Sequence, residues 1–344
     1  MLCRLASRLV ICALFSVSSF VSFSAESVVV PPRTEAPARP TVIPEPPFPV
    51  AYFADQIEAE IKAERARPYW VATELEDYAA ARRVSDYQSI LLNNDIVAFY
   101  GTPLSKRMGV LGVHPLPELD RMLSDYAAVY DVSNGDRGVK KAFYIIYGMA
   151  WPQGEIGILR DSRLNEYIEY ALANDMLVFI DHQIGKYSVE SATKRLLPFL
   201  RYPNVHLALD PEWRTLKPMD EIGSVSADEI NKAQRMMEDY LVEHGYPGER
   251  LLVIHQFNMK MIAGRERVLT DFARVRLIHC ADGFGLPAVK RQAYYYNVLA
   301  KNMPIKAFKL FFKSGVPGTG FDEPLMRPEE VLALDPRPSL IMYQ

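Results

Sequence analysis

The stretch VHLALDPEW, residues 205–213, is an apolar run that ends in two carboxylates, Asp210 and Glu212. On a β-strand, side chains two residues apart lie on the same face, roughly 6.5 Å apart along the strand. Two acids at the open end of one strand can divide acid and base work between them. The stretch therefore predicts a strand that ends in a catalytic site.

Other apolar runs of the chain also end in polar residues. When parallel strands share a sheet, their carboxyl ends meet at one edge, so these polar residues are expected to converge. The runs are FIDHQ at 179–183, VIHQF at 253–257, IHCADGFG at 278–285, FKLFFK at 308–313 and IMYQ at 341–344.

Strand-like runs alternate with helical patterns along the chain. Strands are predicted at 95–101, 141–148, 176–181, 205–210, 250–256, 275–280, 305–311 and 339–343. Helices are predicted between them at 117–130, 162–173, 188–200, 226–244, 257–274, 286–302 and 328–334. Ser226 and Glu229 form a capping-box pattern at the start of the fourth helix, and Gly245 is its expected stop.

Eight strand and helix repeats predict an α/β fold, a (β/α)8 TIM-like barrel that ends at strand eight, with extra N-terminal helices. The main competitor is an open doubly wound sheet. Such sheets usually carry a glycine-rich phosphate loop after the first strand. Here that position reads GTPLS, residues 101–105, which has neither the glycine pattern nor a Walker lysine.

The N-terminal part of the chain predicts export. Residues 1–25 have a signal-peptide layout, in which Arg4 and Arg8 precede an apolar stretch and a small-residue ending. Residues 26–50 form a Pro-rich linker that favours extended polyproline, and residues 51–344 form the single barrel domain with helices at 51–67 and 74–92. The expected location is periplasmic or extracellular. Membrane association is expected only if the signal segment is retained or lipidated, and Ile11 before Cys12 disfavours lipidation.

Charge and cysteine content limit the possible partners and the source of stability. The net charge is −3, from 39 basic and 42 acidic residues, and loss of Arg4 and Arg8 leaves 37 against 42, or −5. This balance lacks the basic footprint of a nucleic-acid-binding protein. Cys280 is the only cysteine outside the signal segment, so the barrel is expected to rely on a large core without an internal disulfide.

Four acids are candidate catalytic residues: Glu212, Asp210, Asp282 and Asp181. Two of these acids also have a possible structural role. Asp210 can cap the next loop or pair with Arg214, and Asp282 can open a turn with Gly283. Amide, basic and aromatic side chains at strand ends are candidate substrate-binding groups. These are Tyr100, Tyr147, Trp151, Gln183, Trp213, Gln256, Lys309 and Tyr343.

Histidines at strand ends make metal chemistry the rival hypothesis. His182, His255 and His279 end three runs and, with Asp181, Asp210 or Asp282, could supply ligands. No HxH or HExxH spacing supports this, and no metal or cofactor is predicted. His182 is expected to be a satisfied histidine behind the barrel. His255 and Gln256 are neighbours and cannot both face inward, and Gln256 is the one assigned to the site.

The LALDPE run, residues 207–212, resembles the D-x-E ending of strand four in chitinase-like and lysozyme-like glycosidases, which cleave N-acetylated glycans. The resemblance implies that Glu212 protonates the leaving oxygen and that Asp210 is its partner. It makes a cell-wall or extracellular polysaccharide the expected substrate class. The alternatives are a metal-dependent hydrolase or deacetylase, and a non-catalytic glycan-binding or envelope-structural barrel.

A glycosidase acid must stay protonated near neutral pH, which requires apolar surroundings or a neighbouring negative charge. Trp213 and Phe257 are expected to supply the first, and Asp210 the second. A raised pKa is therefore predicted for Glu212. A guanidinium from Arg214 beside Glu212 would have the opposite effect.

Overall fold

The computed structural model describes residues 90–344. The expected signal segment, the Pro-rich linker and the helix at 51–67 lie outside the described residues, as does most of the helix at 74–92. Its end is described as the short helix α3, Ile90–Asn93.

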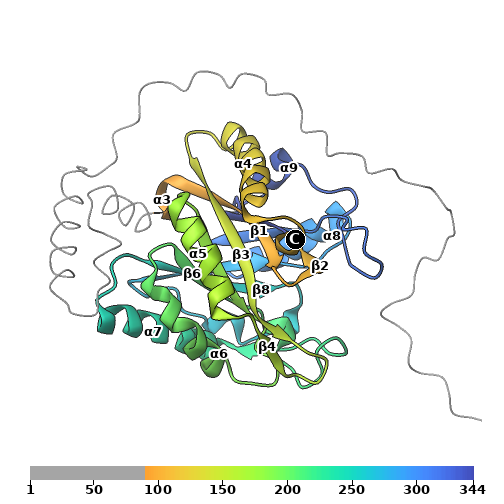
Figure 1. Cartoon of the computed structure of the whole chain (residues 1–344). Helices are drawn as coiled ribbons and strands as arrows, with labels where there is room; N and C mark the ends of the chain where they lie inside the picture. The colour runs from red at the N-terminus through yellow and green to blue at the C-terminus, as the bar shows by residue number, and fades with distance from the viewer. Residues whose placement is uncertain (1–89) are drawn as a thin grey trace, which may run out of the picture. The chain divides into compact units, whose positions relative to one another are not determined.

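Eight parallel strands close into a barrel (Figure 1). Closure comes from β1, which pairs in parallel with both β3 and β12. The prediction of a (β/α)8 barrel that ends at its eighth strand is confirmed. The barrel strands are β1 (Asn94–Thr102), β3 (Gly138–Ala150), β5 (Leu177–His182), β6 (Val205–Leu209), β8 (Arg250–Gln256), β10 (Val275–Ala281), β11 (Lys306–Leu310) and β12 (Leu340–Tyr343).

Helices follow most strands and cover the outside of the barrel (Figure 1). They are α4 (Leu116–Ser133), α5 (Asp161–Ala173), α6 (Val189–Leu196), α7 (Ala227–His244), α8 (Pro287–Val298) and α9 (Pro328–Leu332). The capping box at the start of α7 is formed by Ser226 and Glu229, and Gly245 ends the helix in the left-handed conformation with φ 66°. Both local signals are thus confirmed.

The segment between β8 and β10 differs from its prediction as a helix. It contains two short 3-10 helices, Met259–Met261 and Arg265–Arg267, with the two-residue strand β9 (Ile262–Ala263) between them. β9 pairs with β7 (Val225–Ser226), which precedes α7. The hydrogen bonds of this pairing tie the segment after β8 to the segment after β6, which is why a helix does not form there.

Side chains alternate between the two faces of each barrel strand, and both faces are buried. One apolar set packs against the helices, and the other fills the barrel interior. The interior set includes Ala98, Phe179, Ala208, Val253 and Ala307. Ile90 of α3 joins this set, so the segment before β1 packs against the interior.

Two further short strands extend the barrel strands at their carboxyl ends. β2 (Ser105–Gly109) pairs antiparallel with the end of β1, and β4 (Ile156–Ile158) pairs antiparallel with Gly148–Ala150 of β3. Among residues 90–344, no helix has both the length and the apolar character needed to cross a membrane.

Candidate active site at the carboxyl ends of the barrel strands

A layer of polar side chains lies directly above the apolar interior. Each of its members lies on a barrel strand or directly after one, two positions beyond an inward-facing apolar residue, so the alternation of the strand carries it inward as well. All are almost fully buried. The members are Tyr100, Asp181, Asp210, His255, Asp282 and Lys309, and we call this set the polar layer.

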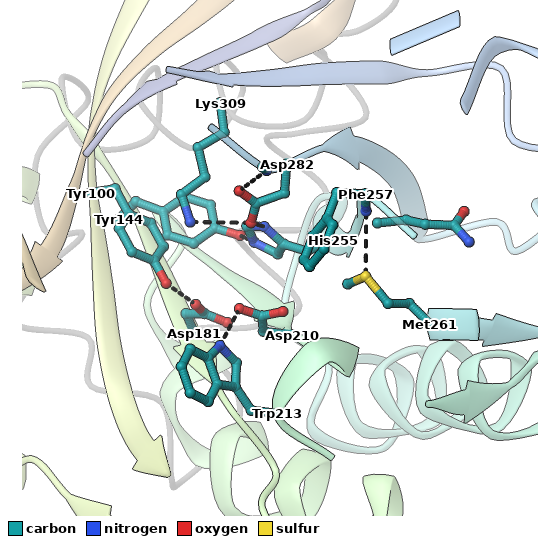
Figure 2. Close-up of polar contacts among 12 residues, drawn as sticks. Tyr100, Tyr144, Asp181, Asp210, Trp213, His255, Phe257, Met261, Asp282 and Lys309 are labelled. Atoms are coloured by element: carbon teal, nitrogen blue, oxygen red, sulfur yellow. Dashed lines mark hydrogen bonds and ion pairs between the residues drawn. The ribbon is translucent and has the colours of Figure 1, made fainter. Parts of the chain in front are cut away.

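A hydrogen-bonded chain crosses the polar layer from β3 to β11 (Figure 2). The hydroxyl of Tyr144 lies 2.6 Å from Nε2 of His255, and Nδ1 of His255 lies 2.9 Å from Oδ2 of Asp282. Nζ of Lys309 donates to the same oxygen at 3.2 Å and lies 3.8 Å from the centre of the Tyr100 ring. The other oxygen of Asp282 accepts from the backbone N–H of Gly283 at 2.7 Å.

Asp181 lies near the end of β5, and Asp210 directly follows the neighbouring strand β6. Each accepts a hydrogen bond from an aromatic side chain (Figure 2). Oδ2 of Asp181 accepts from the Tyr100 hydroxyl at 2.9 Å, and Oδ2 of Asp210 accepts from the indole N–H of Trp213 at 3.1 Å. Within residues 90–344, the Oδ1 atoms of both aspartates are buried and accept no hydrogen bond. Two buried carboxyl groups with unused acceptors strongly favour protonation.

Glu212 lies in a short 3-10 helix, Pro211–Trp213, which packs against β8. Its side chain is half-buried and is within electrostatic reach of Asp210 and Asp282. Arg214 turns elsewhere, donating to Glu229 at 3.1 Å and to the carbonyl of Ser224 at 3.3 Å.

Two cations keep Asp282 ionised. Burial by itself would raise the pKa of Asp282, but Lys309 and His255 outweigh it and hold this pKa far below its usual range. Burial would likewise lower the pKa of His255, yet the hydrogen bond to Asp282 and the charge of Asp210 raise it well above the usual value. The pKa of Lys309 is also raised, because Asp282 and Asp210 outweigh the effect of its burial.

The pKa values of the other three carboxyl groups are raised. Burial, followed by the charges of Asp210 and Asp282, raises the pKa of Glu212 to about 8. Burial raises the pKa of Asp210 to about 7. His255 acts to lower this pKa, and the charge of Asp181 acts to raise it. Burial also raises the pKa of Asp181. The direction predicted for Glu212 is thus found, and Asp282 differs from the other three acids.

Several predicted binding residues face away from the polar layer. Tyr147 lies on the helix side of β3, where its hydroxyl donates to Asp161 at 2.6 Å and accepts from Arg195. Tyr343 also faces the helices, with its hydroxyl 2.7 Å from that of Tyr130. The structure therefore does not bring these two predicted binding residues together with the polar layer. The parity of their strands is the reason, since each is an odd number of positions from an inward-facing residue.

The side-chain oxygens of the two predicted glutamines, Gln183 and Gln256, contact other groups of the protein. Oε1 of Gln183 accepts from the backbone N–H of Ala150 at 2.8 Å, which ties the end of β3 to the end of β5. Oε1 of Gln256 lies 2.9 Å from Nε2 of His279, on the helix side of β8. The assignment of Gln256 over His255 is wrong, because His255 is the residue that faces inward.

Trp151 and Trp213 lie at the same end of the barrel but differ in contact. Trp213 hydrogen-bonds Asp210, as described above, and is half-buried. Trp151 follows the end of β3 with 53% of its surface exposed, and no hydrogen bond connects it with the polar layer among the described residues.

Two of the strand-end histidines are structural. Nδ1 of His182 accepts from the backbone N–H of Ile184 at 2.9 Å, and burial lowers the pKa of His182 to about 4. His279 lies between Gln256 and Lys306 on the helix side, which removes it from the metal alternative. The expectation that His182 is a satisfied histidine is confirmed.

Sequence reasoning missed Tyr144 and Cys280 as neighbours of the site. Both belong to the interior apolar set and lie close to His255. The available signal was strand parity, because Tyr144 and Cys280 lie an even number of positions from other inward-facing residues of their strands.

The donor atoms of Asp210, His255 and Asp282 lie within 4.8 Å of one another, which is a geometry that a metal ion requires. A histidine ligand must offer a free nitrogen on a neutral ring. Here Nδ1 of His255 contacts Asp282, Nε2 contacts Tyr144, and the ammonium of Lys309 already lies against Asp282. The charges and hydrogen bonds of the polar layer therefore fit a divalent cation poorly.

No protein-family model matches this chain, and no curated protein matches it. Among solved structures it is similar to an oxaloacetate acetylhydrolase in complex with oxalate, at 13% identity over 76% of this chain and 79% of that one, with a TM-score of 0.43. It is also similar to a trimodular GH5_4 endoglucanase, at 13% identity over 75% and 57% of the two chains, with a TM-score of 0.41. A GH138 enzyme targeting pectin rhamnogalacturonan II gives 10% identity over 77% and 37%, with a TM-score of 0.37.

Proposed function

We propose that this protein is an exported glycosidase that acts on a cell-wall or extracellular polysaccharide. The observation that carries the proposal is the division of charge among neighbouring carboxyl groups. Glu212 has its pKa raised to about 8, whereas the pKa of Asp282 is held far below its usual range. Carboxyl groups with pKa values pushed apart are the arrangement that glycoside hydrolysis uses.

In this proposal Glu212 is the general acid that protonates the leaving glycosidic oxygen. Asp282 is the ionised partner, which either attacks the anomeric carbon or removes a proton from the attacking water. The separation of the two carboxyl groups in a substrate complex decides between these routes, with about 5 Å favouring retention and about 6.5–9.5 Å favouring inversion. Asp210 raises the pKa of Glu212 and is the alternative partner.

The test is incubation of the purified protein with a panel of polysaccharides and peptidoglycan, with release of reducing ends as the readout. Glu212→Gln is expected to abolish release while the fold is preserved. Glu221→Gln is the matched control, because Glu221 lies on the same loop and its side chain bonds only Thr215 and the exposed Lys217 among the described residues. Undiminished activity of Glu212→Gln on a substrate that the parent cleaves would rule out the assignment.

Binding assays separate catalysis from recognition. A non-catalytic glycan-binding barrel would retain a glycan on a column and release no reducing ends, and Glu212→Gln would leave that retention unchanged. A catalytic site is expected to bind the same glycan in the Glu212→Gln variant and to cleave it only in the parent.

The grouping of Asp210, His255 and Asp282 makes a metal-dependent hydrolase or deacetylase the second candidate. Such an enzyme would need His255 deprotonated and Lys309 displaced from Asp282. Metal analysis of the purified protein, and activity before and after treatment with a chelator, separate the two candidates. Loss of activity with the chelator and recovery with one divalent metal would favour the second.

A further inference from the structure

A buried lysine outside the polar layer joins the ends of two of its strands. Lys290 is on α8 and is 2% exposed. Its Nζ donates to the backbone carbonyl of Gly283, which follows Asp282, and to the backbone carbonyl of Lys309. One side chain thus contacts the backbone next to Asp282 and the backbone of Lys309 itself.

The carboxylate of Asp322 makes the matching contacts with backbone N–H groups. Oδ1 accepts from Gly285 at 2.9 Å, and Oδ2 accepts from Phe311 at 3.0 Å. Oδ2 also lies 3.5 Å from Nζ of Lys290. Asp322 is buried as well, so the pair holds the segments after β10 and β11 together without access to water.

The turn after Asp282 requires a glycine. Gly283 has φ +89°, and a Cβ at this position would lie 3.1 Å from the Cβ of Phe257. Glycine adopts this conformation without strain, and the hydrogen bonds of Gly283 fix the direction of the turn. The Lys290 contact with the Gly283 carbonyl is one of these, together with the N–H bond from Gly283 to Asp282.

We propose that Lys290 and Asp322 are positioning residues that fix Asp282 against Lys309 and His255. The part of this inference that concerns turnover rests on the proposed glycosidase function. The part that concerns the position of Asp282 does not, and the titration of His255 reports it.

The Lys290→Met variant distinguishes a positioning role of Lys290 from a direct effect of its charge, because the two change the pKa of His255 in opposite directions. Lys290→Met removes a positive charge near Asp282, and by charge alone this would raise the pKa of His255. If Lys290 instead acts by positioning, its loss loosens the segment after β10 and lengthens the contact between Asp282 and His255. The pKa of His255 then falls, by about one unit.

The experiment is a titration of the His255 ring by NMR in the full chain, with the signal assigned by its loss in His255→Gln. Lys290→Met and Asp322→Asn are both expected to lower the His255 pKa. Lys290→Gln, which keeps an N–H donor without the charge, is expected to lower it less, and it provides a second test if Lys290→Met does not fold.

Lys306→Met is the matched control. Lys306 is also a buried lysine that donates to backbone carbonyls, those of Asn297 and Ala300, but it contacts His279 on the helix side. This variant is expected to leave the His255 titration unchanged. An unchanged or raised His255 pKa in both Lys290 variants would overturn the proposal.

If the glycosidase assignment holds, Lys290→Met is also expected to lower turnover roughly 10- to 100-fold and to shift the pH profile. A purely structural role would lower thermal stability and leave the pH profile in place. If no polysaccharide is cleaved, the proposed function fails while the titration still decides the role of Lys290.

Discussion

Nζ of Lys309 lies 3.2 Å from Oδ2 of Asp282, and both side chains are only 4% exposed. A buried ion pair of this kind costs desolvation, so it is stable only where further hydrogen bonds complete it. His255 and the backbone N–H of Gly283 supply those bonds to Asp282. The result is one carboxyl group whose pKa is held low beside others whose pKa values burial raises.

Activity is expected to fall as pH rises through about 8. Burial and the neighbouring acids raise the pKa of Glu212 to about 8, so Glu212 carries its proton at neutral pH and loses it above that value. A general acid must be protonated, and therefore the alkaline limb of the pH profile reports its ionisation. The measurement is kcat/KM between pH 5 and 10 on a cleaved polysaccharide. Constant activity to pH 10 would contradict the assignment.

Asp210→Asn is expected to stabilise the fold at pH 8. The folded-state pKa of Asp210 is raised to about 7, above the unfolded value of about 3.9, so between these values the folded state binds more protons and stability falls as pH rises. The amide carries no charge and removes this loss, which is on the order of a few kcal/mol.

Urea unfolding of the parent and Asp210→Asn at pH 5 and pH 8 measures this effect. The gain in the free energy of unfolding should be larger at pH 8. An equal gain at pH 5 and pH 8 would contradict the prediction, because it would show that the ionisation of Asp210 does not change between these two pH values.

Lys309→Met is expected to destabilise the protein by about 3–5 kcal/mol, because it leaves the buried Asp282 carboxylate without its ammonium partner. Lys313→Met is the control, since Lys313 forms an exposed pair with Glu323. Exposed pairs contribute about 0–1 kcal/mol. Chemical denaturation of both variants checks the difference, and similar losses in the two would argue against a buried pair.

Tyr144→Phe and Tyr147→Phe test which face of β3 belongs to the site. The Tyr144 hydroxyl contacts His255, and its loss leaves a buried ring nitrogen without a partner, which is expected to cost about 1–3 kcal/mol and to lower activity. Tyr147→Phe removes contacts with Asp161 and Arg195 on the helix side, so its activity is expected to remain at the parent level. If Tyr147→Phe lost activity and Tyr144→Phe kept it, the site would belong to the helix side of β3, which would contradict the proposed site.

Much of the fold was predictable because its signals are local. The strand at 250–256 was predicted with the bounds that the structure has, and the capping box of α7 needed only Ser226 and Glu229. The segment at 257–274 was not predictable in this way. Its pairing of β9 with β7 depends on a strand more than 30 residues away in the sequence.

The sequence by itself determined the eight repeats, the parallel barrel and the placement of acidic residues at strand ends. It did not determine which residue of an adjacent pair faces the interior, because both faces of a barrel strand are buried and both accept apolar or satisfied polar side chains. His255 and Gln256 show this: only the packed barrel turns His255 toward Asp282 and Gln256 toward His279. Tertiary structure also decided the charges, since Asp282 and Asp210 are the same residue type and differ in pKa because the Lys309 ammonium lies against Asp282.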